Sequence, residues 1–289
     1  MIRYCRSSDL PVLRLLAQTV ALPPVLAVGE MSWVMERQGE VVGYAVIAAA
    51  PGLPGVADLA GFIAPGWQRR GWGRELLRFV CRQARRRGFS QLSCALPALD
   101  MPAALFLNRF GFYLEHEERR LALRDLSALP PVCLPPSFTV SALPLRTAVR
   151  QFRLLYDACF APHPWYQPYQ DDAEVLAEME QTHSDLTDLL FLEHEGQPVG
   201  FAWVRRMPAA VGEIEPIGIL PAFQGQGLGR NLLLYALRRL YEQGSQTAQI
   251  AAWSQNLPAL HLYESLGFQP GDSLFYLAHD LKSSTSPGS

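Results

Sequence analysis

The 289-residue sequence is almost without lysine, which occurs once, at Lys282, so nearly all of its positive charge is arginine. We interpret this shortage as a coding bias rather than a functional trait. The 25 basic and 27 acidic residues leave a formal net charge of −2, which creates no overall field that would attract nucleic acid or a membrane surface. With 49% hydrophobic and 18% charged residues, the chain has the composition of an ordinary globular protein.

The sequence also has no apolar run near the roughly 18 residues that a membrane-spanning helix needs. Its first residues, Met1-Ile2-Arg3, do not resemble a secretory signal. None of the six histidines has the spacing of metal ligands. The cysteines are odd in number and scattered, which is typical of reduced thiols rather than a disulfide framework: they are Cys5, Cys81, Cys94, Cys133 and Cys159. We therefore expect a cytoplasmic protein with no membrane partner, no nucleic-acid partner and no metal.

What the sequence does contain is a glycine-rich turn between an expected strand and an expected helix. The turn, Gln224-Gly225-Gln226-Gly227-Leu228-Gly229-Arg230, follows an apolar run and opens a leucine-rich segment. The first N–H groups of a helix have no internal partner and carry partial positive charge, and glycine lets a ligand approach the backbone closely. The pattern predicts an anion site suited to a pyrophosphate, with a tight turn that binds no ligand as the alternative.

Two other glycine-rich motifs fit this turn less well. A dinucleotide-binding fold requires Gly-x-Gly-x-x-Gly and an acidic residue about twenty positions later, whereas Gly225, Gly227 and Gly229 alternate. A nucleotide-binding P-loop requires a lysine after its last glycine, and Arg230 occupies that position.

The same turn occurs earlier in the chain, as Gln68-Arg69-Arg70-Gly71-Trp72-Gly73-Arg74. Gln68 and Gln224 lie 156 residues apart, and Gly111 and Gly267 keep the same offset. We interpret this self-similarity as a tandem duplication of a whole domain. It predicts one domain at about 1–128, a proline-rich linker at 129–136, a second domain at 137–282 and a disordered tail at 283–289. Strands and helices that alternate within each copy indicate an α/β (α+β) fold.

Both copies resemble the GNAT superfamily of acyl-CoA-dependent N-acyltransferases, over nearly the whole chain. The resemblance rests on Gln-x-x-Gly-x-Gly after a strand that ends in apolar-x-Pro, and on a later element, Tyr263 to Phe268, that is similar to Tyr-x-x-x-Gly-Phe. It implies two tandem GNAT domains, each with a mixed, mostly antiparallel central sheet flanked by helices. It also implies acetyl-CoA as co-substrate, bound by Ile63, Gln68, Arg69, Arg70, Gly71, Trp72, Gly73 and Arg74 in the first copy and by Ile217, Ile219, Gln224, Gly225, Gln226, Gly227, Leu228, Gly229, Arg230 and Asn256 in the second.

Transfer of an acetyl group to an amine needs a base that removes a proton, donors that polarise the carbonyl, and an acid for the leaving thiolate. The resemblance implies that Glu213, eleven residues before Gln224, is the base. Glu215 shares its strand face and is the alternative. Tyr263 resembles the family's general acid, although a core tyrosine would have the same pattern. Asn256 is expected either to contact the pantetheine or to cap a helix.

The first copy lacks these catalytic side chains. At the offset of 156, Glu213, Glu215 and Tyr263 correspond to Ala57, Leu59 and Leu107. We therefore expect the C-terminal copy to catalyse. The N-terminal copy is expected to bind CoA or acyl-CoA without turnover, or only to support the fold.

The leading hypothesis is an N-acetyltransferase that moves an acetyl group from acetyl-CoA to a primary amine of a small-molecule acceptor. Amines of peptides or proteins are an alternative acceptor, and a non-enzymatic acyl-CoA-binding sensor or scaffold is an alternative function. An aromatic segment with His163, Trp165, Tyr166 and Tyr169 is expected to line the acceptor pocket or to form a hydrophobic plug. The sequence does not indicate the oligomeric state.

Overall fold

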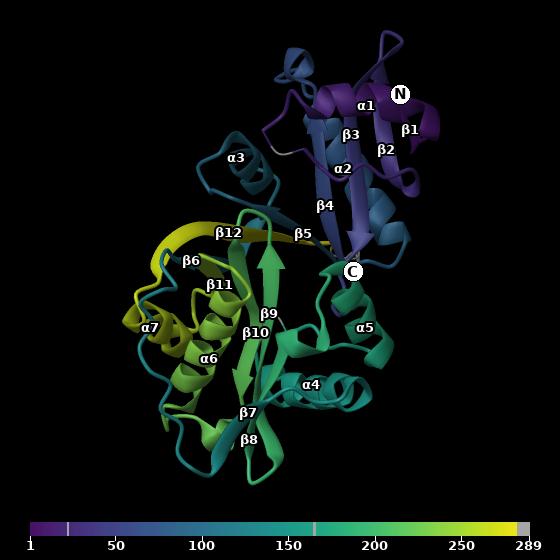
Figure 1. Cartoon of the computed structure of the whole chain (residues 1–289). Coiled ribbons are helices and arrows are strands. Elements are labelled where there is room, and N and C mark those ends of the chain that lie inside the picture. The colour runs from purple at the N-terminus through teal and green to yellow at the C-terminus, as the bar shows by residue number, and fades with distance from the viewer. Residues whose placement is uncertain (22, 164–165, 282–289) are drawn as a thin grey trace, which may run out of the picture. The chain divides into compact units, whose positions relative to one another are not determined.

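The computed structural model describes residues 1–21, 23–163 and 166–281, which form two compact units (Figure 1). Unit 1 comprises Met1–His116 and the described residues from Phe275 onward, and unit 2 comprises Glu117–Leu274. Trp165 and the tail expected at 283–289 lie outside the described residues. No helix in the described ranges combines the length and the apolar character needed to cross a membrane.

The N-terminal copy contributes six strands and three α-helices to the described chain. They are β1 (Ile2–Cys5), α1 (Leu10–Ala17), β2 (Gly29–Arg37), β3 (Glu40–Ala49), β4 (Val56–Ile63), α2 (Trp72–Arg86), β5 (Gln91–Leu96), α3 (Pro102–Asn108) and β6 (Tyr113–Leu123). Short 3-10 helices lie at η1 (Ser7–Asp9) and η2 (Pro65–Trp67).

The C-terminal copy adds six further strands and four α-helices to the described chain. They are β7 (Phe138–Ser141), α4 (Leu145–Phe160), α5 (Asp172–Gln181), β8 (Leu189–His194), β9 (Gln197–Met207), β10 (Val211–Ile219), α6 (Leu228–Glu242), β11 (Thr247–Trp253), α7 (Leu257–Ser265) and β12 (Gln269–Asp280). Its 3-10 helices are η3 (Leu186–Asp188) and η4 (Pro221–Phe223). Both ends of α6 lie 156 residues after the ends of α2, so the repeat found in the sequence is also a repeat of structure.

Each unit has a mixed sheet that is mostly antiparallel, as expected. In unit 1 the strand order is β1-β2-β3-β4-β5-β12, and in unit 2 it is β6-β11-β10-β9-β8-β7. The single parallel contact in each described sheet joins β4 to β5 in unit 1 and β10 to β11 in unit 2. These parallel pairs carry the glycine-rich turns at their ends, so each sheet places a helix start beside a parallel junction.

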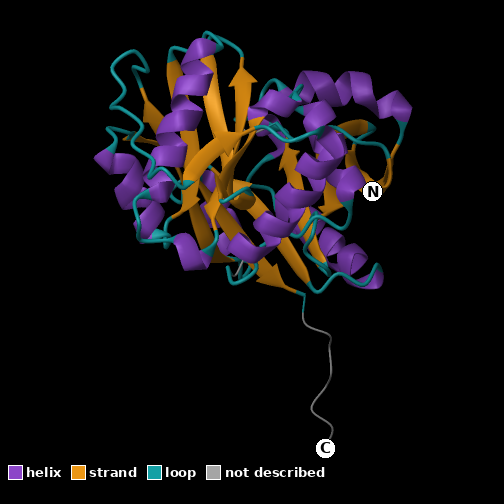
Figure 2. Ribbon diagram, turned by 60° about the horizontal axis from the view of Figure 1, so that its bottom comes forward, coloured by secondary structure: helices purple, strands orange, loops and turns teal. Residues whose placement is uncertain are grey.

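Helices cover both faces of each sheet (Figure 2). In unit 1, Val80 of α2 packs with Leu92 of β5, and Leu13 of α1 packs with Tyr44 of β3 in a separate cluster. All four side chains are fully buried. The Tyr44 hydroxyl is nonetheless bonded, since it donates to the carbonyl of Ala27 at 3.0 Å, as buried polar groups generally are.

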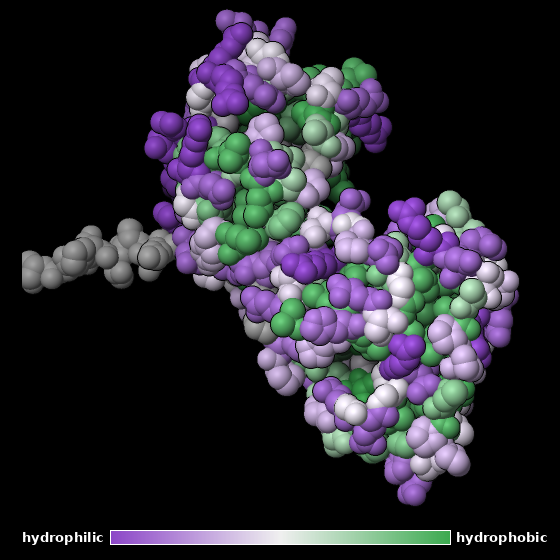
Figure 3. All heavy atoms as spheres, turned by 90° about the vertical axis from the view of Figure 1, so that its left-hand side faces the viewer, coloured by the Kyte–Doolittle hydropathy of each residue, from purple (hydrophilic) through white to green (hydrophobic). Residues whose placement is uncertain are grey.

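Unit 2 has the same two-faced construction. Leu237 of α6 and Ile250 of β11 belong to one core, and Phe152 of α4 and Trp203 of β9 belong to the other. The Phe152 and Trp203 rings meet edge to face, with centroids 5.2 Å apart, which is a favoured aromatic geometry. On the face shown in Figure 3, hydrophilic side chains surround smaller hydrophobic areas.

The compact units divide the chain at positions other than the expected limits of 128 and 137. The later part of β6 belongs to unit 2, where Leu123 pairs with Ala248 of β11. The later part of β12 belongs to unit 1, where Phe275 pairs with Leu96 of β5. Each copy of the repeat therefore supplies the last strand of the other copy's unit, and the linker begins after that exchange.

Candidate active site

The candidate site in unit 2 lies where the parallel pairing of β10 with β11 ends. Their parallel pairing runs from Val211–Thr247 to Ile214–Ile250. On its other side, β10 pairs with β9 and its register shifts between Ile214 and Ile217, a stretch that contains the cis peptide bond of Glu215-Pro216. Proline cannot donate to a ladder, so the sequence itself favours a break here. The backbone of β10 beyond this break is paired to β9 alone.

The glycine-rich turn connects this strand to α6 with a specific backbone geometry. Gln224 Nε2 donates to the carbonyl of Ile219 at 2.9 Å, which ties the turn to the end of β10. Gly225 and Gly227 both have φ of +75°, and a Cβ built on either would meet nothing within 4 Å. Side chains rarely adopt this conformation, whereas glycine does so at little cost. Open space therefore lies beside both glycines of the turn that leads into α6, and the start of a helix generally favours an anion.

Unit 1 repeats the main features of this turn. Gln68 Nε2 donates to the carbonyl of Ile63 at 2.9 Å, and Gly71 has φ of +86°. The turns differ in side chains: Arg69, Arg70 and Trp72 take the places of Gly225, Gln226 and Leu228. The Arg37 guanidinium lies 4.0 Å from the ring centroid of Trp72. The anion cradle, meaning this turn with the following helix start, is thus present in both units.

Two carboxylates lie on one face of β10 at the break. Glu213 is paired in register with Arg205 of β9 and Gln249 of β11, and Glu215 follows two residues later on the same face. Burial is the main cause that raises the pKa of Glu215 above its usual value, and the negative charge of Glu213 raises it further. Part of the Glu215 surface is exposed to solvent. The rise in its pKa therefore comes from the protein atoms that surround the residue and not from complete removal from water.

The buried phenol of Tyr263 lies within electrostatic range of Glu215. Tyr263 lies on α7, is 5% exposed, and has its ring centroid 6.0 Å from that of Phe268. Burial raises the pKa of its hydroxyl, and the charge of Glu215 adds to this rise. Tyr263 is therefore both a core residue and a protonated phenol beside Glu215 at neutral pH.

Asn256 is the N-cap of α7, because its side chain accepts a hydrogen bond from the N–H of Ala259 at 3.3 Å. The capping alternative for this residue is thus what the structure shows. A contact to pantetheine would come in addition to this bond.

The sequence did not indicate three further ionisable residues near the carboxylates of β10. They are Tyr156 of α4, Glu178 of α5 and Arg205 of β9. Arg205 forms an ion pair with Glu178 of α5. Burial raises the pKa of Tyr156 to about 12, with further contributions from the charges of Glu178 and Glu215. The alternation along β9 could have indicated that Arg205 faces Glu213, but nothing local indicates that α5 brings Glu178 to it.

The aromatic segment after α4 is anchored by polar bonds where the structure describes it. The Tyr166 hydroxyl donates to Asp157, and the Tyr169 hydroxyl donates to Glu178 Oε2 at 2.5 Å. The His163 ring lies 5.0 Å from that of Trp253. These contacts give this side of unit 2 a wall of mixed aromatic and charged character, which a hydrophobic plug alone would not have.

The corresponding positions in unit 1 hold only apolar groups. Ala57 is fully buried, Leu107 is 6% exposed, and Leu59 is half-buried. Unit 1 therefore has an anion cradle but neither the carboxylate pair nor the phenol. Among the residues of the described ranges, no group of three or more His, Cys, Asp and Glu side chains could hold a metal ion.

The model of the acetyltransferase (GNAT) family matches this chain twice, over residues 10–112 and 150–268. Each match contains one glycine-rich turn and the later Gly-Phe element. The two matched segments agree with the duplication inferred from the offset of 156.

Relatives of known name resemble the chain over most of its length. A mycothiol acetyltransferase from Thermomonospora curvata is 34% identical over 235 residues, which cover 80% of this chain and 76% of that protein. A second mycothiol acetyltransferase, from Renibacterium salmoninarum, is 29% identical over 276 residues, which cover 93% of this chain and 77% of that protein.

Solved structures share the fold at lower identity. A GCN5-related N-acetyltransferase from Sphaerobacter thermophilus superposes with a TM-score of 0.74 at 16% identity, covering 98% of this chain and 96% of that one. A tandem GNAT protein from the clavulanic acid biosynthesis pathway gives a TM-score of 0.67 at 20% identity, covering 98% and 99%. At these identities the likeness concerns the fold.

Proposed function

Because the chain belongs to the acetyltransferase (GNAT) family, it is an acyl-CoA N-acetyltransferase, and we propose that its C-terminal copy transfers acetyl groups to a small primary amine. The observation that carries this proposal is the contrast between the units. Both have the glycine-rich turn, whereas the carboxylates Glu213 and Glu215 of β10 and the buried phenol of Tyr263, whose pKa the charge of Glu215 helps to raise, have apolar counterparts in unit 1.

Acetyl-CoA is proposed to bind along the free edge of β10. Its pyrophosphate would accept hydrogen bonds from the first N–H groups of α6, where the helix dipole favours an anion. Its pantetheine would pair with the backbone of Ile217 and Ile219, whose other side is already paired to β9. Gln226, Leu228, Gly229 and Arg230 complete this proposed cradle.

The chemistry is a direct displacement in a ternary complex. The neutral amine nitrogen attacks the thioester carbonyl carbon, and the carbonyl π electrons move to oxygen. The carboxylate pair accepts the proton lost by the nitrogen. As the carbonyl re-forms, the C–S bond breaks, and Tyr263 gives its proton to the departing sulfur. The products are an amide and CoA thiol, and no covalent intermediate with the protein is required.

The two carboxylates are proposed to act as one proton-accepting pair. The family resemblance favours Glu213 as the group that takes the proton. The pKa of Glu215 is raised, and its charge acts on Tyr263. We propose that Glu215 is therefore a stronger proton acceptor near neutral pH than an ordinary carboxylate.

The N-terminal copy is proposed to bind CoA or acetyl-CoA without turning it over. Its cradle has the same glutamine anchor and left-handed glycine as unit 2, which supports binding. The apolar Ala57, Leu59 and Leu107 can neither accept nor supply a proton, which supports the absence of turnover there.

The acceptor is proposed to be a small molecule, because the relatives that cover most of this chain are mycothiol acetyltransferases. The unacetylated precursor of mycothiol is therefore the first acceptor to assay. The wall beside the carboxylates offers this acceptor neutral hydroxyl groups, one carboxylate and one guanidinium group. They belong to Tyr156, Tyr166, Tyr169, Glu178 and Arg205.

Thiol release from acetyl-CoA, measured across a panel of small amines and peptide N-termini, tests this function. Glu213→Gln should lower kcat by roughly 10²-fold or more, in the range for loss of a general base. Glu215→Gln should retain turnover but move the acidic limb of the pH profile to lower pH, because the carboxyl group with the raised pKa is gone. Unchanged kcat and an unchanged pH profile in both variants would contradict the proposal, as would thiol release that no amine accelerates.

A further inference from the structure

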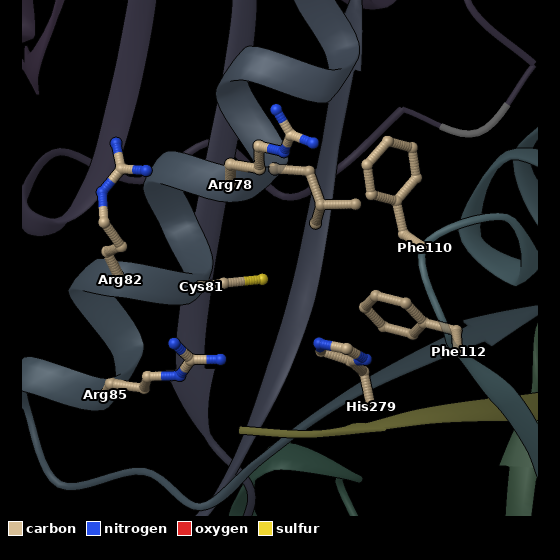
Figure 4. A pocket seen from close by; sticks show the side chains of 8 residues that line it. Arg78, Cys81, Arg82, Arg85, Phe110, Phe112 and His279 are labelled. Carbon is tan, nitrogen blue, oxygen red and sulfur yellow. The ribbon is translucent and has the colours of Figure 1, made fainter. Parts of the chain in front are cut away.

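A hollow of about 340 Å³ lies along α2 in unit 1 and begins at Leu77, five residues after the first residue of the helix (Figure 4). It is lined by Leu77, Arg78, Cys81, Arg82, Arg85, Phe110, Phe112 and His279. The three arginines come from successive turns of the helix and are exposed. Figure 4 shows Phe110, Phe112 and His279 across the hollow from α2. None of the described residues forms an ion pair with any of these arginines.

The matching face of α6 in unit 2 is covered by the linker together with the residues just before it, from Leu126 to Leu134. Leu126 is 1% exposed, and the apolar side chains that follow it, Leu129, Val132 and Leu134, pack against the same core as α6. Arg238 Nη2 donates to the carbonyl of Pro130 at 3.1 Å, and the N–H of Cys133 donates to Asn231 Oδ1 at 2.6 Å. The linker thus binds this helix face through apolar side chains and through hydrogen bonds to its backbone.

The two faces are equivalent by position and differ in chemistry. At the offset of 156, Arg82 corresponds to Arg238, the residue that holds the linker carbonyl. Arg78 and Arg85 correspond to Leu234 and Tyr241, so two positive charges replace a leucine and a tyrosine. The unit 1 face therefore keeps the arginine that corresponds to Arg238 and has apolar side chains beside it, and it adds positive charge.

The strand that leads to each face is also equivalent. Ala122 of β6 pairs with Gln249, and Ala278 of β12 pairs with Ser93, which lies 156 residues before Gln249. The linker follows β6. After β12 comes the buried Leu281. Residues 282–289 beyond it contain no acidic side chain and no large apolar one. They therefore offer neither a charge that would pair with three arginines nor a side chain that would pack against the phenylalanines.

We propose that this face of α2 docks an extended acidic segment of a partner protein, in the manner in which the linker lies on α6. Carboxylates of the segment would pair with Arg78, Arg82 and Arg85, since guanidinium and carboxylate groups form paired, charge-assisted bonds. An apolar side chain of the segment would fill the hollow against Leu77 and Phe112. The site is separate from the acetyl-CoA cradle and does not depend on turnover.

Fluorescence anisotropy with a labelled 13-residue peptide tests this docking. The peptide has leucine or valine at the same spacing as Leu126, Leu129, Val132 and Leu134 of this chain. Its remaining positions are glutamate. Binding is measured to the full chain at low ionic strength, where such pairs are strongest. The triple variant Arg78→Ala/Arg82→Ala/Arg85→Ala should bind about tenfold more weakly, since exposed pairs contribute about 0.2–1 kcal/mol each.

A matched control removes three other exposed arginines of unit 1, as Arg14→Ala/Arg86→Ala/Arg109→Ala, and should bind the peptide within about twofold of the parent chain. Cys81→Phe, which fills the hollow without changing charge, should also weaken binding. Thermal melting shows that each variant is folded.

Four results would overturn the proposal. They are equal affinity in the arginine triple variant and the control variant, equal binding of a peptide with lysine in place of glutamate, displacement of the peptide by CoA, and a clear gain in affinity when residues 283–289 are deleted. The last result would mean that the chain's own end competes for this face.

Discussion

At the scale of single residues, the site depends on one coupled group of ionisable side chains. Burial is the main cause that raises the pKa of both Tyr263 and Glu215; the negative charge of Glu215 adds to the rise at Tyr263, and that of Glu213 adds to the rise at Glu215. The same arrangement that keeps a carboxyl group basic therefore keeps the neighbouring phenol protonated. A base and an acid can act in one reaction only if both protonation states coexist at the working pH.

Tyr263→Phe should lower kcat for acetyl transfer by about 10²-fold, because the departing thiolate loses its proton donor. The KM for acetyl-CoA should change little, since the ring and its packing remain. The parent enzyme should show no loss of activity from this group as pH rises toward 10, because burial keeps its pKa above the usual value. Stopped assays from pH 6 to pH 10 measure both effects.

Full activity in Tyr263→Phe would show that another group, or water, protonates the sulfur. Leu107 at the matching position of unit 1 offers a control: Leu107→Tyr restores the phenol there without a carboxylate beside it. That variant should gain no activity.

At the scale of elements, the linker is a structural part of unit 2 rather than a spacer. Proline-rich composition predicted a linker at 129–136, and residues of this segment pack against the core that contains α6. Composition could not indicate that Leu126 would be buried, because its burial depends on a helix that lies a hundred residues later. The same reason applies to Glu178 and Arg205, whose pairing joins two elements that no sequence pattern connects.

Leu126→Ala should lower the free energy of unfolding of unit 2 by about 2–4 kcal/mol, as expected for truncation of a fully buried leucine. Denaturant titration with a fluorescence readout measures this loss. Leu154→Ala, at a side chain that is 49% exposed, is the matched control and should cost less than about 1 kcal/mol. Equal losses in the two variants would mean that the linker does not stabilise α6.

At the scale of the whole molecule, the sequence predicted the duplication and the fold class of each copy but not the boundary between the units. The offset of 156 predicted both glycine-rich turns and the contrast between Glu213, Glu215 and Tyr263 and their apolar counterparts. It could not reveal the strand exchange, because alternating side chains show that β6 and β12 are strands but not which sheet each completes.

The exchange predicts which fragments fold. Residues 117–274 contain every strand of the described sheet of unit 2, whereas residues 137–282 lack β6 and leave β11 without its antiparallel neighbour. The first fragment should unfold cooperatively, and the second should be less stable or aggregate, since it exposes a strand edge. Circular dichroism during thermal denaturation compares them. A second fragment as stable as the first would mean that β6 adds nothing to unit 2.

The assignment of catalysis to unit 2 is the central claim, and two matched cradle variants test it most directly. Gly229 and Gly73 are equivalent, and a Cβ at either would make only ordinary contacts, at 3.7 Å and 3.4 Å or more. Aspartate at either position suits a helix start but repels a pyrophosphate. In steady-state assays, Gly229→Asp should lower kcat/KM for acetyl-CoA by roughly 10²-fold, and Gly73→Asp should leave it within about twofold. Loss of activity in Gly73→Asp with activity kept in Gly229→Asp would contradict the account.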